Sequence, residues 1–396
     1  MMKNKLLNSL ILAALAAPGL AMAADAPAVT DPATPHMAMP STPTFGNVLD
    51  ASGVSINGYL DTAYSHLSGT GLFTSGTANR VFDTQPNSFN LQQAAITIAK
   101  QPKEGFGGLV NLTLGQDANV INSYGGGSGN AYAGVAGTSN SDLTQAFMQY
   151  ATGNLTAIAG KFVTAAGAEV INSTSNTNYS RSILFGYAIP FSHTGVRATY
   201  AMNDQLSLFA GLNNGWDQVK DANKQKTVEL GGSYMPNKMF MLSAVDYNGT
   251  EQVAGTPGGA QGKRNLLDLV GTLTVSDSLN FVLNPDFGSQ ENATLANGST
   301  GTAKWSGLAA YANYQINDPW SVSVRGETFK DTDGYRTGVA QTWKEATVTV
   351  GYAASKNTEL RGELRKDFSD VASFAYSDGI ARKGQNSVAL EALYKF

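Results

Sequence analysis

The chain has no cysteine among its 396 residues. This absence excludes disulfide bonds and thiolate metal ligands. Histidine is also scarce, since the chain carries only His36, His66 and His193, and none has a recognisable motif around it. Zinc sites need clustered ligands, and hydrolytic triads need a histidine with a defined partner, so we expect no metal, no cofactor and no enzyme.

Long apolar runs are missing after the first 23 residues, although 42% of the chain is hydrophobic and only 14% is charged. A membrane-spanning helix needs about 18 consecutive apolar residues, so we expect no such helix after residue 23.

The formal charge is −4, and this weak acidity argues against a nucleic-acid partner, for which a basic patch is typical.

The N-terminus has the pattern of a secretory signal peptide. Lys3 and Lys5 precede an apolar stretch, and Ala21-Met22-Ala23 forms a small-residue cleavage site. We predict a cleaved signal over residues 1–23, a Pro/Ala-rich leader over 24–52, and one folded domain over 53–396. A membrane anchor is the less favoured alternative, because the apolar stretch is short and interrupted.

The C-terminus alternates between two faces. Val388, Leu390, Ala392, Tyr394 and Phe396 share one face, with polar residues opposite. A strand with lipid on one side and water on the other shows this period of two. The terminal Phe396 also resembles the signal by which bacterial outer-membrane barrels are recognised for insertion.

From residue 53 onward, alternating segments are joined by short turns and long loops in regular succession. Seven short turns carry Pro, Gly, Asn, Asp or Ser and fall at 101–105, 152–154, 203–204, 236–238, 276–278, 317–319 and 355–357. Eight long connections cover about 67–87, 117–141, 163–193, 214–225, 248–262, 288–303, 330–342 and 368–383. Fifteen connections separate sixteen strands, which predicts an all-β transmembrane antiparallel barrel with short periplasmic turns and long extracellular loops.

Aromatic residues gather beside the short turns, as expected of a membrane-interface girdle. They are Phe106, Tyr150, Tyr200, Tyr234, Tyr314, Trp320, Tyr352, Tyr394 and Phe396. Three tryptophans near the loop bases, Trp216, Trp305 and Trp343, fit the outer girdle or, less well, a path that stacks sugar rings.

Charged residues within the predicted strands oppose apolar neighbours. A charge on the lipid face costs about 2–4 kcal/mol for Arg or Lys at the bilayer midplane, so these side chains must face the lumen. The predicted pore-lining residues are Lys161, Arg197, Arg325, Glu327, Glu359, Arg361, Glu363 and Arg365. Sixteen strands enclose a lumen wide enough for an aqueous channel.

The longest loop, 163–193, contains apolar residues that need a place to bury. We predict that it folds inward, packs Ile183, Leu184, Phe185 and Ile189 against the wall and narrows the pore. Its charged residues Glu169 and Arg181 would join the constriction, near wall residues such as Lys161 and Arg197. Facing rows of acid and base would impose a transverse field. Alternatively, Arg181 pairs with an acid only to hold the loop down.

Four segments resemble the OmpL-like β-barrel porins. They are Gly160-Lys161-Phe162, Asn178 to Ser182, Pro190 to Arg197 and Asn213 to Asp217, with Phe89 to Ala94 in the same succession upstream. The resemblance spans the mature chain and implies a Gram-negative outer-membrane porin. It implies no catalytic residues.

We therefore expect an outer-membrane porin whose water-filled channel passes small hydrophilic solutes and ions by passive diffusion. A substrate-selective channel and a structural or adhesion barrel with a closed lumen are the alternatives, and an outer-membrane enzyme is the least favoured. Expected partners are membrane lipid, the solutes, the barrel-assembly machinery through Phe396 and, by resemblance to sixteen-stranded porins, further copies of the chain in a homotrimer.

Overall fold

The computed structural model describes residues 49, 51–74, 76, 79–121, 140–252 and 260–396. The predicted signal peptide and almost all of the leader lie outside these residues. None of the helices in the described part of the chain is long and apolar enough to cross a membrane.

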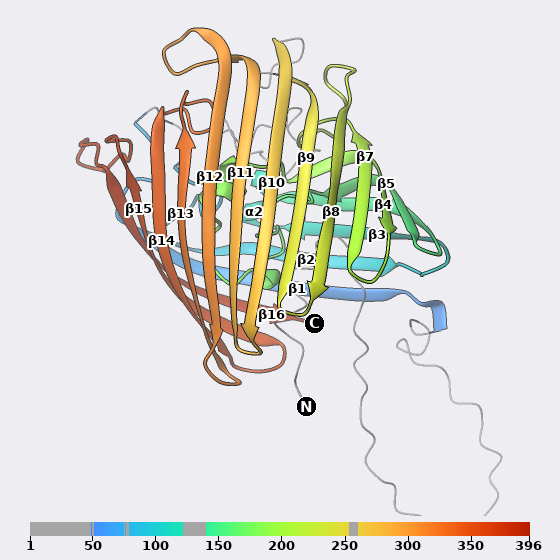
Figure 1. Ribbon diagram of the computed structural model, residues 1–396. Helices are drawn as coiled ribbons and strands as arrows, with labels where there is room; N and C mark the ends of the chain where they lie inside the picture. Colours follow the sequence, from blue (N-terminus) through green and yellow to red (C-terminus); the bar gives the residue numbers. More distant parts are fainter. Residues whose placement is uncertain (1–48, 50, 75, 77–78, 122–139, 253–259) are drawn as a thin grey trace, which may run out of the picture.

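Sixteen antiparallel strands form one closed barrel (Figure 1). Each strand pairs with its neighbours in sequence, and β1 closes the sheet by pairing with β16, where Tyr59 lies opposite Lys395. The strands are β1 (Ser55–Leu67), β2 (Ser88–Lys100), β3 (Gly105–Leu114), β4 (Ser141–Thr152), β5 (Leu155–Val163), β6 (Ser192–Ala201), β7 (Leu206–Asn213), β8 (Thr227–Asn237), β9 (Phe240–Gln252), β10 (Gln261–Ser276), β11 (Leu279–Thr294), β12 (Thr300–Gln315), β13 (Trp320–Asp331), β14 (Gln341–Ala353), β15 (Thr358–Ser369) and β16 (Gly384–Lys395). The predicted strand number and connectivity are confirmed.

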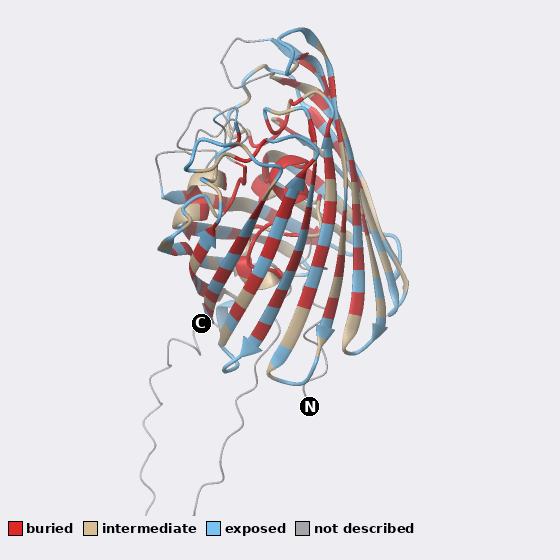
Figure 2. Cartoon of the chain, turned by 90° about the vertical axis from the view of Figure 1, so that its left-hand side faces the viewer, coloured by how far each residue is buried: buried red, intermediate tan, exposed pale blue. Residues whose placement is uncertain are grey.

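Burial alternates along the strands, and the stripes of Figure 2 follow this period of two. On β14, for example, Glu345, Thr347 and Thr349 are buried while Ala346, Val348 and Val350 are exposed. The outward residues form the lipid-facing surface, because the two faces of a barrel strand meet different solvents. All nine predicted girdle aromatics are exposed, and Phe106 and Tyr150 pair across strands with ring centroids 4.8 Å apart.

In two predicted loops, most of the described residues are strand. In the segment 248–262, residues 248–252 belong to β9 and 261–262 to β10, while 253–259 lie outside the described part. The segment 288–303 is mostly the ends of β11 and β12, joined by a connection at 295–299. Their Gly, Asn, Ser and Thr content suggested loop, but paired backbones form a ladder whatever the polarity of their side chains. Hence β10, β11 and β12 reach 16 residues each.

In the described residues, three short helices lie in the connections between strands. Helix α2 (Gln116–Ile121) follows β3, and the 3-10 helix η2 (Ser173–Ser175) and α3 (Ile183–Tyr187) lie in the connection between β5 and β6. Both of the latter begin at a capping side chain, since Asn172 accepts from the Thr174 N–H and Ser182 from the Phe185 N–H. These caps give the β5–β6 connection a fixed internal shape.

Candidate functional site: the folded-in loop and its charged wall

The connection between β5 and β6, residues 164–191 and here called the inner loop, packs inside the barrel. No residue between 161 and 195 is exposed, and the continuous run from 179 to 193 is buried throughout. An external loop would have a solvated face, so this burial shows that the barrel wall surrounds the segment. The predicted inward fold of the loop is confirmed.

Apolar contacts hold α3 of the inner loop against the wall. Ile183, Leu184, Phe185 and Ile189 are all buried in one apolar cluster. Leu184 packs directly against Gly307 of β12. A Cβ atom added at Gly307 would lie 2.6 Å from Cδ1 of Leu184. The chain turns into this packing at Gly167, whose φ of +92° favours glycine.

Wall carboxylates hold the backbone of the same loop. Glu363 of β15 accepts hydrogen bonds from the N–H groups of Tyr179 and Ser180, at 2.8 and 3.1 Å. Glu327 of β13 accepts from those of Ile183 and Leu184, at 2.6 and 3.1 Å. Hydrogen bonds to an ionised acceptor are stronger than neutral ones. These two carboxylates therefore fix successive N–H pairs of the inner loop.

Arg325 of β13 links the inner loop to its own strand and to β14. Its guanidinium lies 2.7 Å from Glu169 of the loop and 2.8 Å from Glu345 of β14, and it donates to the Ser180 carbonyl at 2.6 Å. The side chain is fully buried. Glu169 also accepts from the Tyr311 hydroxyl. The remaining N–H groups of this buried arginine donate to the hydroxyls of Ser180 and Thr347, at 3.1 and 3.4 Å, so that all five donors have acceptors.

Two further arginines extend the charged wall along β15. Arg365 lies 2.7 Å from Asp367 and donates to the Arg181 carbonyl at 2.7 Å. Arg361 pairs with Glu391 of β16 at 3.1 Å and with Glu359 at 2.8 Å. Bases and acids therefore alternate as close pairs on the same wall, and the predicted facing rows of acid and base are wrong for this region.

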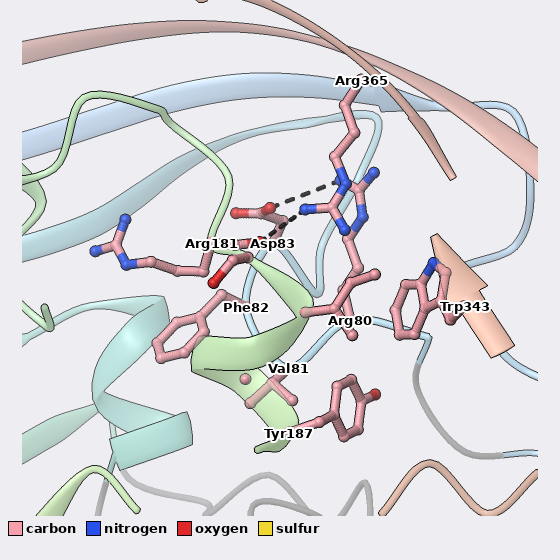
Figure 3. Close-up of a pocket in the computed structure, with 11 residues that line it drawn as sticks. Arg80, Val81, Phe82, Asp83, Arg181, Tyr187, Trp343 and Arg365 are labelled. Carbon is pink, nitrogen blue, oxygen red and sulfur yellow. Dashed lines mark hydrogen bonds and ion pairs between the residues drawn. The ribbon is translucent and has the colours of Figure 1, made fainter. Parts of the chain in front are cut away.

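The first extracellular loop adds a cation to this wall. Arg80 lies 2.8 Å from Asp367 and 3.6 Å from Asp83. Figure 3 shows Arg80 beside Arg365 in a small pocket between the first loop and α3, while the Arg181 side chain extends to the opposite side of Phe82. Sequence alone gave no signal for Arg80, because it lies in a loop without alternation.

Lys161 and Arg197 lie apart from this cluster. Lys161 of β5 pairs with Asp142 of β4 at 3.0 Å, and Arg197 of β6 pairs with Glu229 of β8 at 2.5 Å. The prediction that Glu169 and Arg181 sit near these two bases is therefore wrong. Glu169 meets Arg325 instead, and Arg181 lies 4.0 Å from Asp117. The loop crosses the lumen towards β13–β15 because its apolar residues pack on that side.

Sequence reasoning missed several members of the charged wall. Glu345 and Glu391 both face inward, and the alternation of β14 and β16 carried that signal. Asp117 is buried in α2 and accepts from the Gln93 amide at 2.6 Å. Its short helix has no sequence pattern that would place it inside a barrel.

The three tryptophans are also placed inside. Trp216, Trp305 and Trp343 are each at most 2% exposed and belong to the apolar cluster of the inner loop. The Trp305 indole donates to the Ala188 carbonyl at 3.1 Å. The outer-girdle interpretation of these three residues is therefore wrong, because outward residues at that end of the barrel would be exposed.

Buried carboxylates outnumber buried bases in the described residues, fifteen to nine. Burial raises the pKa of a carboxyl group, because it disfavours the charged form. In the connections, burial raises the pKa of Asp83 to about 6 and that of Asp117 to about 7, against the lowering effect of nearby arginines.

The model of one protein family, described as "Putative beta-barrel porin-2, OmpL-like", matches residues 53–396. Among solved structures, the outer membrane channel DcaP of Acinetobacter baumannii aligns with a TM-score of 0.61 at 12% identity, covering 87% of this chain and 97% of that one. OprB of Pseudomonas putida has a TM-score of 0.55 at 12% identity, with coverage of 89% and 96%. OmpT of Vibrio cholerae has a TM-score of 0.54 at 12% identity, with coverage of 87% and 97%. No curated protein matches.

Proposed function

Because the chain belongs to the OmpL-like β-barrel porin family, and so forms a channel in the outer membrane, we propose that it passes small hydrophilic solutes and ions by passive diffusion. The observation that carries the proposal is the inner loop, which narrows a sixteen-stranded lumen and is surrounded by paired charges. A sixteen-stranded barrel without such a filling encloses an aqueous channel. The loop would then set the size limit, and the charges would set ion preference.

The ten sequence-predicted residues divide into three groups in this proposal. Glu169, Arg181, Arg325, Glu327, Glu363 and Arg365 position the inner loop, since each contacts it and is buried. Lys161 links β5 to its neighbour β4, and Arg197 links β6 to β8 across the intervening strand β7. Arg361 and Glu359 lie nearest to the periplasmic end, and the Glu359 side chain is 29% exposed. Glu359 is therefore the member of the set that is best placed to meet a passing ion.

Reversing the charge of Glu359 should change ion preference without releasing the loop. The Glu359→Lys variant adds two positive charges at the lumen, while Arg361 keeps Glu391 as a partner. We expect the reversal potential in a salt gradient to shift towards anions. The matched control is Asp318→Lys, in an exposed periplasmic turn, which should leave the reversal potential unchanged. Equal potentials in both variants would remove Glu359 from the ion path.

The excess of buried acids predicts a preference for cations that depends on pH. Asp83 and Asp117 ionise near pH 6 and 7, so raising the pH from 5 to 8 adds negative charge beside the inner loop. We expect cation selectivity, measured by reversal potential, to rise over this interval. Asp117→Asn should flatten the upper part of the rise. A selectivity that is constant between pH 5 and 8 would contradict the proposed filter.

The finer parts of the proposal concern export and assembly. Residues 1–23 would be a cleaved signal peptide, 24–52 a periplasmic leader, and 53–396 the barrel. Phe396 is exposed and closes the last ladder by exchanging backbone hydrogen bonds with Gly58, which suits a residue read by the barrel-assembly machinery. A homotrimer is expected by analogy with other sixteen-stranded porins, and no catalytic step or cofactor is proposed.

A conducting pore is the first property to test. The full chain refolded in a planar bilayer should give stable single-channel steps whose size scales with bulk salt. A folded barrel that stays silent would overturn the diffusion channel and favour a closed structural barrel, in which the inner loop is a permanent plug.

A further inference from the structure

Lysine and arginine are segregated between the two faces of the barrel. Eight of the nine arginines are buried, and six of them pair with carboxylates. Lysines within the strands are exposed instead, apart from Lys161, which is buried and paired with Asp142. The planar guanidinium suits buried, bidentate pairs, whereas the lysine ammonium on its flexible stem suits a hydrated interface.

Four of these lysines form a row near the extracellular ends of four consecutive strands. Lys304, Lys330, Lys344 and Lys366 lie on β12, β13, β14 and β15, and all four are exposed. Lys330 lies opposite Ser306, two residues from Lys304, and Lys344 lies opposite Thr328, two residues from Lys330. Lys366 lies opposite Ala346, two residues from Lys344. Tilted strands give this constant stagger to residues at one depth.

The row marks the upper edge of the lipid-facing surface. On the exposed face of β14, the residues on the periplasmic side of Lys344 are Ala346, Val348 and Val350. On β15, Leu364 holds the same place relative to Lys366. The Lys366 ammonium lies 5.0 Å from the ring centroid of Phe368, the next outward residue on the extracellular side. Aromatic rings and long basic side chains both suit the membrane interface. The lysines therefore lie at the level of the lipid headgroups, and the outward residues on their periplasmic side lie at the level of the acyl chains.

The four ammonium groups are without partner carboxylates. Within the described residues, none of the four forms an ion pair. The outward positions of β12 to β15, which are described in full, carry no Asp or Glu at this end. Two rim carboxylates, on Asp333 and Asp370, accept the backbone N–H groups of Lys304 and Thr342. Such a row of exposed cations, next to an apolar surface, is complementary to an anion from outside the chain.

We propose that this lysine row docks the phosphate groups of lipid headgroups in the outer leaflet. Neighbouring lysines stand about 8 Å apart, given the strand spacing and a two-residue stagger. Flexible side chains at that spacing can converge on one phosphate or bridge two on a single headgroup. The lipid is favoured over free phosphate because the row borders the apolar surface on which acyl chains lie. This inference rests on the outer-membrane placement and does not require the channel to conduct.

The test is lipid binding by the full chain. Native mass spectrometry would measure retained lipid after incubation with bisphosphorylated lipid A, dephosphorylated lipid A or phosphatidylcholine. We expect the protein to retain the phosphorylated form preferentially. The variant with Lys304, Lys330, Lys344 and Lys366 all changed to Gln should bind it roughly tenfold or more weakly, since each lysine near an anionic surface contributes severalfold.

The matched control changes four exposed lysines at the periplasmic end, Lys100, Lys103, Lys238 and Lys356, to Gln and should retain lipid like the parent protein. Folding of both variants would be checked by heat-dependent mobility, and conduction would be recorded separately, so that a silent pore does not affect the result. Equal loss in both variants, or displacement of the lipid by millimolar inorganic phosphate alone, would overturn the lysine row as a lipid site.

Discussion

Deleting residues 170–188 is expected to raise single-channel conductance severalfold. The segment contains α3 and the apolar residues that fill the lumen, and every residue in it is buried or half-buried. Its removal would leave the aqueous lumen that a sixteen-stranded barrel encloses. The measurement is conductance of the refolded variant in a planar bilayer, with polyethylene glycols of increasing size as a check on pore radius.

A second deletion controls for nonspecific effects of shortening a loop. Residues 219–224 lie in the connection between β7 and β8 and are half-buried or exposed. Their removal should leave conductance near the parent value. If the 170–188 deletion folds but conducts like the parent protein, the inner loop does not constrict the pore, and the path must run elsewhere in the barrel.

Replacing Arg325 by Ala is expected to cause the largest loss of stability among single substitutions in the charged wall. The change leaves Glu169 and Glu345 buried without their shared cation. Removing one partner of a buried ion pair costs about 3–5 kcal/mol. The temperature at which the barrel loses its compact mobility in detergent should fall, and current noise should rise as the inner loop loosens.

Two variants distinguish the charge effect from lost packing. Arg325→Met combined with Glu169→Gln and Glu345→Gln removes three charges together and should recover much of the lost stability. Glu327, which lies 3.9 Å from Arg325, still accepts the backbone N–H groups of Ile183 and Leu184. Lys344→Ala, on the outward face of the next strand, should change stability little. If Arg325→Ala unfolds at the parent temperature, the guanidinium does not hold the inner loop.

The barrel itself could be predicted from sequence, and the site only in part. Alternation along segments such as 357–367 places Arg361, Glu363 and Arg365 inward whatever the partners are, because lipid excludes charge. The same alternation carried Glu345 and Glu391. The apolar content of 183–191 indicated that the loop folds inward. What failed were the partners of the loop charges, since these depend on the direction in which the loop crosses the lumen.

The sequence by itself determined the strand number, the order of short turns and long loops, and which face of each strand meets water. These follow from a period of two and from local turn chemistry, which act over a few residues. Only the tertiary structure decided that Arg80 and Asp117, which come from separate connections, meet the inner loop, and that three tryptophans pack inside. Such contacts join residues far apart in the sequence, 117 positions for Trp305 and Ala188, and their geometry depends on how one apolar loop fills the closed barrel.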